Sequence, residues 1–278
     1  MNTLADLQQL TAAATRTESP CGAGTMVWRS WGHGPALVML HGGAGSWQHW
    51  VRNVATFSGS RRVIAPDLPG LGESADPPAP ADMPTVAAIV AAGIDGLLGP
   101  QATYDVVGFS FGASVGGHLA LAHGARVRSL TLLGAGGLVK PHTPMTLERV
   151  RDKTGYALKA AHRTNLLRTM VADPACVDDL ALVIQDWNAS RSRLNTPGLI
   201  ALRPLAVSLP QLRIPVNAIW GERDQIAYYP IADRVAALRE LRPGIAPRII
   251  PAAGHWAAYE AAAAFNATLA ALLLNPGS

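Results

Sequence analysis

Short apolar runs alternate along most of the chain with longer segments of helical periodicity. Six runs bounded by Gly, Pro or Asp have the length of buried strands: Ala36–Leu40, Arg62–Ala65, Tyr104–Val107, Ser129–Leu133, Val216–Trp220 and Arg248–Ile250. Helix-length segments include Thr85–Leu98, Ala113–His123 and Pro230–Glu240, and the Ala-rich stretch from Trp256 to Leu274 indicates one packed amphipathic helix. This alternation predicts an α/β fold, with βαβ units forming a mostly parallel sheet covered by helices on both faces.

One long interval lacks strand-like runs. From about Gly137 to Leu212 the pattern is helical and interrupted by prolines. One apolar helical face is formed by Leu158, Ala161, Leu166 and Met170, and a second by Leu180, Val183, Ile184 and Trp187. We therefore expect residues 137–212 to form a helical cap over the carboxyl edge of the sheet, inserted into a core of residues 1–136 and 213–278.

Composition narrows the class of protein. The chain has 278 residues, 49% of them hydrophobic and 15% charged, with a net charge of +4. Its arginines are scattered, which favours a mildly basic surface over nucleic-acid binding. Cys21 and Cys176 lack metal-ligand spacing and suggest no disulfide framework, so a cytoplasmic location is the expectation. We expect neither a signal peptide nor a membrane span, because Met1–Thr17 lacks a basic segment followed by an apolar one and no sufficiently long apolar run occurs.

The most informative motif is Gly-x-Ser-x-Gly. The apolar run ending at Phe109 leads directly into Ser110, and a helix-compatible segment follows Gly112. Strand, sharp turn and helix in this order are the context of a nucleophile elbow, in which a strained turn presents the serine. Gly108 and Gly112 lack Cβ atoms, so the strand and the helix can approach closely. The alternative is a buried serine in a Gly-rich turn.

Three further segments follow predicted strands. His41-Gly-Gly-Ala-Gly-Ser-Trp47 is rich in glycine, so its backbone N–H groups can face a ligand without obstruction. Gly221-Glu-Arg-Asp224 follows the strand ending at Trp220, and Gly254-His-Trp256 follows the last strand. Ser, Asp and His thus occur in the order associated with α/β-hydrolases.

These motifs, together with Asp67-Leu-Pro-Gly-Leu-Gly-Glu-Ser74, resemble those of the α/β-hydrolase superfamily over almost the whole chain. The resemblance implies an eight-stranded sheet and an inserted cap. It also implies a catalytic triad in which Ser110 is the nucleophile, His255 the base and Asp224 the group that orients the histidine. Glu222 and Arg223 share the acid loop, but Asp224 lies further past the strand and reaches the histidine better.

Fixed donors are needed for a developing oxyanion. The candidates are the backbone N–H groups of Phe111 and Gly43, with Ala44 as the alternative to Gly43. Residues expected to line the substrate pocket are Gly42, Ala44, Phe109, Trp187 and Trp256. We expect His41 to bind loop backbone and Asp67 to hold its own turn by side-chain hydrogen bonds.

The His-Gly-Gly and Gly-His-Trp motifs are similar to those of hydrolases that cleave carbon–carbon bonds in ring-fission products of aromatic degradation. Two positions depart from that pattern. Phe109 stands where those enzymes usually carry Asn, and Asp186, in place of an Arg, precedes Trp187.

The resulting hypothesis is a serine hydrolase that needs neither cofactor nor metal and acts on a small, largely apolar ester or lactone, with an amide also open. A carbon–carbon hydrolase is the alternative. Rivals of other classes are a ligand receptor without turnover and a cofactor-free oxygenase on the same fold. The expected partner is the small-molecule substrate, with neither nucleic acid nor membrane, and apolar cap surface would permit a homodimer.

Overall fold

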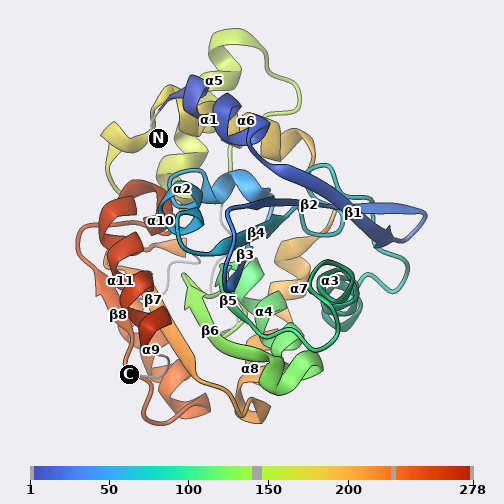
Figure 1. The fold of residues 1–278 in the computed structure, drawn as a ribbon. Helices are drawn as coiled ribbons and strands as arrows, with labels where there is room; N and C mark the ends of the chain where they lie inside the picture. Colours follow the sequence, from blue (N-terminus) through green and yellow to red (C-terminus); the bar gives the residue numbers. More distant parts are fainter. Residues whose placement is uncertain (1–2, 140–145, 227–229, 276–278) are drawn as a thin grey trace.

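The computed structural model describes residues 3–139, 146–226 and 230–275. Within them the strands form one eight-stranded sheet in the order β1-β2-β4-β3-β5-β6-β7-β8 (Figure 1). The strands are β1 (Thr15–Cys21), β2 (Gly24–Trp31), β3 (Ala36–Leu40), β4 (Arg62–Pro66), β5 (Tyr104–Phe109), β6 (Val127–Leu133), β7 (Val216–Gly221) and β8 (Arg248–Ile250). From β4 to β8 all neighbours pair in parallel, whereas β1–β2 and β2–β4 are antiparallel. The predicted mostly parallel sheet is confirmed, and the six predicted strands correspond to β3–β8 to within two residues at either end.

The first two strands did not stand out in the apolar pattern. They form a hairpin whose turn contains Gly22 at φ +54°, where an added Cβ would lie 2.3 Å from the carbonyl oxygen of Asp76. Only the last residue of β1, Cys21, is buried, because β1 is an edge strand exposed along most of its length. An edge strand has no need of a continuous apolar run, so the apolar pattern carries little signal for β1.

Helices cover both faces of the sheet, as predicted. The helices of the core are α1 (Leu4–Ala12), α2 (Val54–Ser58), α3 (Met83–Leu98), α4 (Phe111–His123), α9 (Ile231–Leu241), α10 (Ala257–Glu260) and α11 (Ala262–Leu274). In β3, Val38 and Leu40 join the apolar cluster that includes α3 and α4, while Leu37 and Met39 join the cluster that includes α2 and α11. Alternate residues of one strand thus contribute to two cores, which is why all of β3 is apolar and buried.

The C-terminal segment corrects one prediction. A single helix was expected from Trp256 to Leu274, but the structure breaks it at Ala261, whose φ and ψ are −120° and 46°. The carboxylate of Glu260, just before the break, accepts hydrogen bonds from the backbone N–H groups of Gly254, Ala172 and Asp173. These contacts fix α10 against two loops, and the chain continues after Ala261 as the separate helix α11.

Among the described residues between β6 and β7, the α-helices are α5 (Gly155–Thr169), α6 (Asp179–Ser190), α7 (Thr196–Ala201) and α8 (Pro204–Ser208). The described part of 137–212 contains no strand. Figure 1 shows α5 and α6 together at one end of the molecule. One detail of the predicted helical faces is wrong, because Val183 is 43% exposed, whereas Leu180 and Ile184 are buried.

The inserted segment packs on loops that follow the strands. The backbone N–H of Trp256 donates to the carbonyl oxygen of Met170 at 2.6 Å, and those of Arg193 and Leu194 donate to Gly70 at 3.0 and 3.2 Å. Those loops follow β8 and β4, so the segment contacts the carboxyl edge of the sheet at these two places. Its last part, by contrast, is packed into the core, where Leu205 and Leu209 join the cluster under α4. The division at residues 136/137 and 212/213 stays a prediction.

Within the described residues, no helix has the length and apolar character needed to cross a membrane.

Candidate active site

Ser110 occupies a strained turn between β5 and α4. Its φ and ψ are 51° and −109°, an unfavourable combination for a side chain with a Cβ atom. Such strain costs about 1–3 kcal/mol and persists only where neighbours hold it. Here the backbone N–H of Ser110 donates to Leu133 at 2.8 Å, and its carbonyl oxygen accepts from Gly136 at 3.2 Å.

Glycines permit the close crossing of strand and helix that the motif predicted. A Cβ on Gly108 would lie 2.4 Å from the carbonyl oxygen of Gly112. A Cβ on Gly112 would lie 2.3 Å from that of Leu40. Both distances are far below van der Waals contact with backbone atoms, so neither position accepts a side chain. The Gly-x-Ser-x-Gly spacing is therefore required by packing here.

His255 and Asp224 form a buried pair. His255 Nδ1 lies 2.8 Å from Asp224 Oδ2, and the two side chains are 1% and 0% exposed. Arg234 from α9 brings Nη1 to 3.0 Å from the same oxygen. Burial by itself raises the pKa of Asp224. The charge of His255, the hydrogen bond to it and the charge of Arg234 outweigh burial and hold that pKa below its ordinary value. Asp224 is therefore ionised at neutral pH and accepts the Nδ1 proton.

The pairing leaves the other ring nitrogen available. With Nδ1 donating to Asp224, neutral His255 carries its lone pair on Nε2. Nε2 is buried and has no hydrogen-bond partner among the described residues, Ser110 included. The ring lies 4.8 Å from that of Phe109, the residue before the serine. The structure thus brings the pair to the elbow and leaves Nε2 free to accept a proton.

Gly134, at the end of β6, makes room for this pair. A Cβ there would lie 3.0 Å from both Cε1 and Nδ1 of His255 and 3.4 Å from Asp224 Oδ2. Its φ of +53° is also one that side chains rarely adopt. Sequence analysis did not single out Gly134, because only the fold brings it beside the histidine.

The two predicted oxyanion donors are neighbours. A Cβ on Gly43 would lie 3.7 Å from the Cβ of Phe111, the first residue of α4. Ala44, the alternative to Gly43, is exposed and has φ 45°. Gly42 is engaged elsewhere, since its N–H donates to His49 Nδ1 at 3.2 Å. Gly43 is therefore the better placed of the loop amides.

His49 is a second residue that sequence analysis missed. Besides accepting from Gly42, its ring lies 5.4 Å from Phe109 and 5.1 Å from Trp256. Trp256 Nε1 donates to the carbonyl oxygen of His49 at 2.9 Å. Burial, followed by the charges of the neighbouring His41 and His255, lowers the pKa of His49 well below its ordinary value. It is therefore a neutral hydrogen-bond acceptor for the glycine loop.

His41 and Asp67 have the structural roles predicted for them. His41 Nε2 accepts from the N–H of Leu68 at 2.8 Å, so its Nδ1 carries the proton that goes to the carbonyl oxygen of Gly42 at 2.7 Å. Asp67 accepts from the N–H groups of Trp47 at 2.9 Å and Glu73 at 3.0 Å. These bonds tie the glycine loop after β3 to the turn after β4.

Burial of His41 predicts a pH-dependent contribution to stability. Burial lowers the pKa of His41 to about 4, with the Gly42 hydrogen bond acting weakly in the other direction. The unfolded chain takes up this proton near pH 6.5 and the folded chain only near 4. The contribution of His41 to the free energy of unfolding is therefore complete above pH 6.5. About 3 kcal/mol of it is lost as the pH falls from 6.5 toward 4.

Burial also raises the pKa of Asp67 to about 6, and this stabilises the folded chain as the pH falls over the same range. Comparing wild type with His41→Gln isolates the effect of His41, because Asp67 is present in both proteins. We expect the wild type to lose stability relative to the variant between pH 7 and pH 4, as measured by urea unfolding. A difference in unfolding free energy that stays constant with pH would contradict this account.

The predicted pocket residues fall into two groups. Gly42, Phe109 and Trp256 lie together beside the elbow. A Cβ on Gly42 would lie 2.9 Å from Phe109 Cδ1, and the ring of Trp256 contacts that of His49 and is stacked 4.1 Å from that of Tyr259. Trp187 lies on α6 with the guanidinium of Arg191 4.5 Å over its ring. No described contact joins Trp187 to the elbow, so its role stays a prediction.

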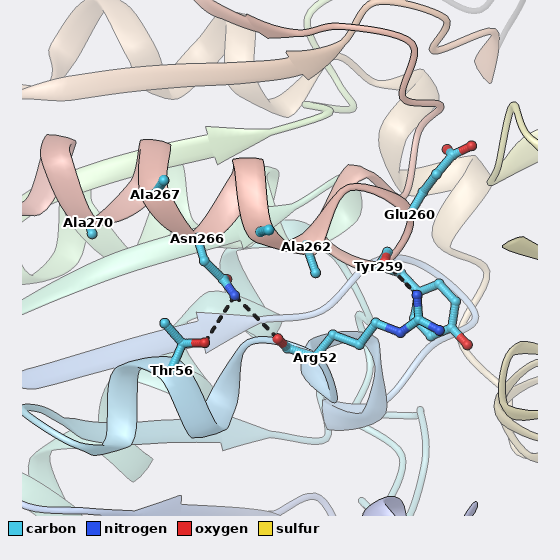
Figure 2. Close-up of a pocket in the computed structure, with 9 residues that line it drawn as sticks. Arg52, Thr56, Tyr259, Glu260, Ala262, Asn266, Ala267 and Ala270 are labelled. Atoms are coloured by element: carbon cyan, nitrogen blue, oxygen red, sulfur yellow. Dashed lines mark hydrogen bonds between the residues drawn. The ribbon is translucent and has the colours of Figure 1, made fainter. Parts of the chain in front are cut away.

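A surface pocket of about 510 Å³ lies beside α10 and α11, and none of the predicted site residues line it. Figure 2 shows Arg52 extending along it to Tyr259, with Asn266 donating to Thr56 and to the carbonyl oxygen of Arg52. Arg52 also binds Asp178, the N-cap residue of α6, at 2.6 Å. This cluster anchors the inserted helices to the core.

Within the described residues, no group of three or more His, Cys, Asp or Glu side chains could hold a metal ion.

Comparison with known proteins identifies the family. The alpha/beta hydrolase fold family matches residues 35–262, which is most of the chain. The chain belongs to the alpha/beta hydrolase fold family. The predicted resemblance is thereby confirmed, and the protein is an enzyme of the hydrolase class.

Among curated relatives, the hydrolase is 29% identical to 2-hydroxy-6-oxo-6-phenylhexa-2,4-dienoate hydrolase of Burkholderia cepacia, over 88% of this chain and 89% of the relative. Two solved structures share the fold. An esterase from Rhodococcus sp. ECU1013 matches with a TM-score of 0.74 at 22% identity, covering 95% of this chain and 100% of that one. A meta-cleavage product hydrolase from Pseudomonas fluorescens IP01 matches with a TM-score of 0.73 at 23% identity, covering 92% and 97%.

Proposed function

We propose that this enzyme is a serine hydrolase that cleaves a small, largely apolar carboxylic ester or lactone through an acyl-enzyme. The observation that carries the proposal is the buried His255–Asp224 pair, whose ring packs beside Phe109 next to the strained Ser110. A serine hydroxyl is a weak nucleophile at neutral pH and needs such a base. His255 Nε2, unpartnered in the described structure, supplies it.

In the proposed reaction, His255 Nε2 takes the hydroxyl proton as Ser110 Oγ attacks the substrate carbonyl carbon. The tetrahedral intermediate collapses when the imidazolium returns that proton to the leaving alkoxide, and the acyl group remains on the serine. Water, deprotonated by His255, then attacks the acyl carbon. The bond to Ser110 Oγ breaks as the imidazolium returns the proton to that oxygen, and the carboxylic acid leaves. The negative charge of Asp224 stabilises the imidazolium in both halves.

The charge that develops on the carbonyl oxygen would be met by the N–H groups of Gly43 and Phe111. Phe111 is the first residue of α4, so its N–H has no partner within the helix. Loss of one such donor typically costs about 10²- to 10³-fold in turnover. The bonds of His41, His49 and Asp67 would keep the glycine loop fixed to the turn after β4 during the reaction.

The surroundings of the serine favour an apolar acyl group. Phe109 is 1% exposed, and its ring packs on His49, Trp50 and His255, so the residue before the nucleophile offers a substrate no polar side chain. On α6, Asp186 binds His162 at 3.0 Å. At these two positions the carbon–carbon hydrolases usually carry Asn and Arg. Phe109 and Asp186 supply neither a side-chain amide nor a guanidinium, so both positions favour a simple ester.

A second candidate is a carbon–carbon hydrolase of a ring-fission dienol. The observation in its favour is the 29% identity, over most of both chains, to a relative named as such a hydrolase. In that reaction His255 or Ser110 would first help to ketonise the dienol before the carbon–carbon bond is hydrolysed.

A parallel assay separates the two candidates. Purified enzyme and its Ser110→Ala variant are given p-nitrophenyl esters, lactones and a yellow ring-fission dienol. We expect ester or lactone turnover that the variant lacks, with no bleaching of the dienol. Rapid bleaching together with inertness toward esters would favour the second candidate. Saturable binding of these compounds without turnover, or oxygen consumption, would overturn both.

A further inference from the structure

One side chain of the inserted helices lies directly against the glycine loop. Thr196, the first residue of α7, places Oγ1 2.5 Å and its own Cβ 3.2 Å from the position that a Cβ on Gly43 would occupy. The Cβ of Phe111 is 3.7 Å from the same point. The Thr196 hydroxyl therefore packs against Gly43, on the side where Phe111 also lies.

Thr196 is held there by its neighbours in the chain. Its N–H donates to Leu194 at 2.9 Å, and the backbone N–H groups of Arg193 and Leu194 donate to Gly70 at 3.0 and 3.2 Å. The Arg193 side chain is in turn bound to Asp76 at 2.7 Å. The segment before α7 is thus fixed to the turn after β4, and this fixes the position of Thr196 over Gly43.

Four residues further along α7, Ile200 faces the same site. Its Cδ1 lies 3.1 Å from the position of a Cβ on Gly136, which itself lies 3.5 Å from the carbonyl carbon of Ser110. Residues four apart share one face of a helix. One face of α7 therefore lies against the site, with a hydroxyl beside Gly43 and an apolar side chain beside Gly136, near the backbone of Ser110.

The Thr196 hydroxyl is unused in the described structure. Thr196 is only 4% exposed, and its Oγ1 makes no hydrogen bond within the described part of the chain. The Oγ1 atom itself is not fully buried, so the hydroxyl borders open space and is available to bind a polar atom. A substrate oxygen bound between Gly43 and Phe111 would provide that atom.

We propose that the Thr196 hydroxyl is a third hydrogen-bond donor to the substrate carbonyl oxygen, contributed by the inserted helices to the oxyanion site. The inference rests on the proposed function. The hydroxyl hydrogen goes to the oxygen that gains negative charge as the carbonyl carbon becomes tetrahedral. This bond strengthens in the transition state, so its loss lowers kcat more than it raises KM.

Two substitutions at Thr196 separate donation from packing. Thr196→Val keeps the shape and removes the hydroxyl, whereas Thr196→Ser keeps the hydroxyl and removes a methyl group. We expect kcat for the best ester of the panel to fall about 10- to 100-fold in Thr196→Val with KM nearly unchanged, a smaller loss than for a main-chain donor. Thr196→Ser should stay within about threefold of wild type, since it retains the donor. Thermal unfolding of both variants reports on packing.

A larger loss of kcat in Thr196→Ser than in Thr196→Val would overturn the inference, because it would mean that the methyl group matters and the hydroxyl does not. Equal kcat in Thr196→Val and wild type, or equal losses in the two variants, would overturn it as well. Failure of the proposed function looks different, because wild type would then neither hydrolyse the esters nor react with a fluorophosphonate at Ser110. Wild-type activity and labelling therefore serve as the reference for every variant.

Discussion

Ser110→Ala is expected to lower the turnover of an ester substrate by about 10⁵-fold or more, as loss of the nucleophile does in other triads. The substitution removes the atom that forms the acyl-enzyme. It leaves intact the backbone bonds of residue 110 to Leu133 and Gly136, and the His255–Asp224 pair. Initial rates on p-nitrophenyl esters, with circular dichroism to verify the fold, measure the effect. A variant that keeps more than a few per cent of wild-type activity would contradict the role given to Ser110.

Ser110→Gly is the matched variant, because it also lacks the hydroxyl but tolerates the backbone conformation. At φ 51° an alanine remains strained, whereas a glycine does not. We expect Ser110→Gly to be as inactive as Ser110→Ala and about 1 kcal/mol more stable in urea unfolding. The comparison thus separates the strain of the turn from the chemistry of the side chain. Equal stability of the two variants would argue against stored strain at this position.

Asp224→Asn is expected to reduce turnover by about 10⁴-fold. Asp224 is buried and ionised and accepts the Nδ1 proton of His255. A neutral amide can donate to Nδ1, which moves the ring proton to Nε2 and removes the lone pair that must accept the serine proton. It also removes the charge that stabilises the imidazolium. The measurement is kcat/KM for an ester at neutral pH.

Glu222→Gln provides the control for that substitution, since Glu222 belongs to the same loop. Its carboxylate is exposed and accepts from the N–H of Ala252 at 2.8 Å, with no described contact to His255. We expect this variant to stay within a few-fold of wild-type turnover, as is usual for exposed positions away from the chemistry. A large loss of turnover in Glu222→Gln with little loss in Asp224→Asn would show that Glu222, and not Asp224, is the acid of the triad.

The central strands could be predicted from sequence because they are buried on both faces. β3, β5 and β7 consist entirely of buried residues, so each appears as an apolar run. β1 could not be found in this way, because only Cys21 among its residues is buried. The break at Ala261 depends on bonds from Glu260 to Ala172 and Asp173, which lie almost ninety residues away in the chain. No local pattern contains that information.

The same distinction applies to the candidate site. Ser110 and Asp224 follow the buried strands β5 and β7, and His255 follows the short, partly exposed β8, so strand prediction also located them. Gly134, His49 and Thr196 are recognisable only from contacts made by the fold: a backbone beside the histidine, a ring that binds Gly42, and a hydroxyl over Gly43. A threonine in a helical insertion carries no signal of such a position.

The most direct test of the account is whether Ser110 becomes covalently modified. Wild-type enzyme is treated with a fluorophosphonate, and its intact mass and proteolytic peptides are measured by mass spectrometry. The account predicts one adduct, on the peptide that contains Ser110, and no such adduct in Ser110→Ala. An adduct on a different residue, or rapid ester hydrolysis by an enzyme whose Ser110 stays unmodified, would contradict it.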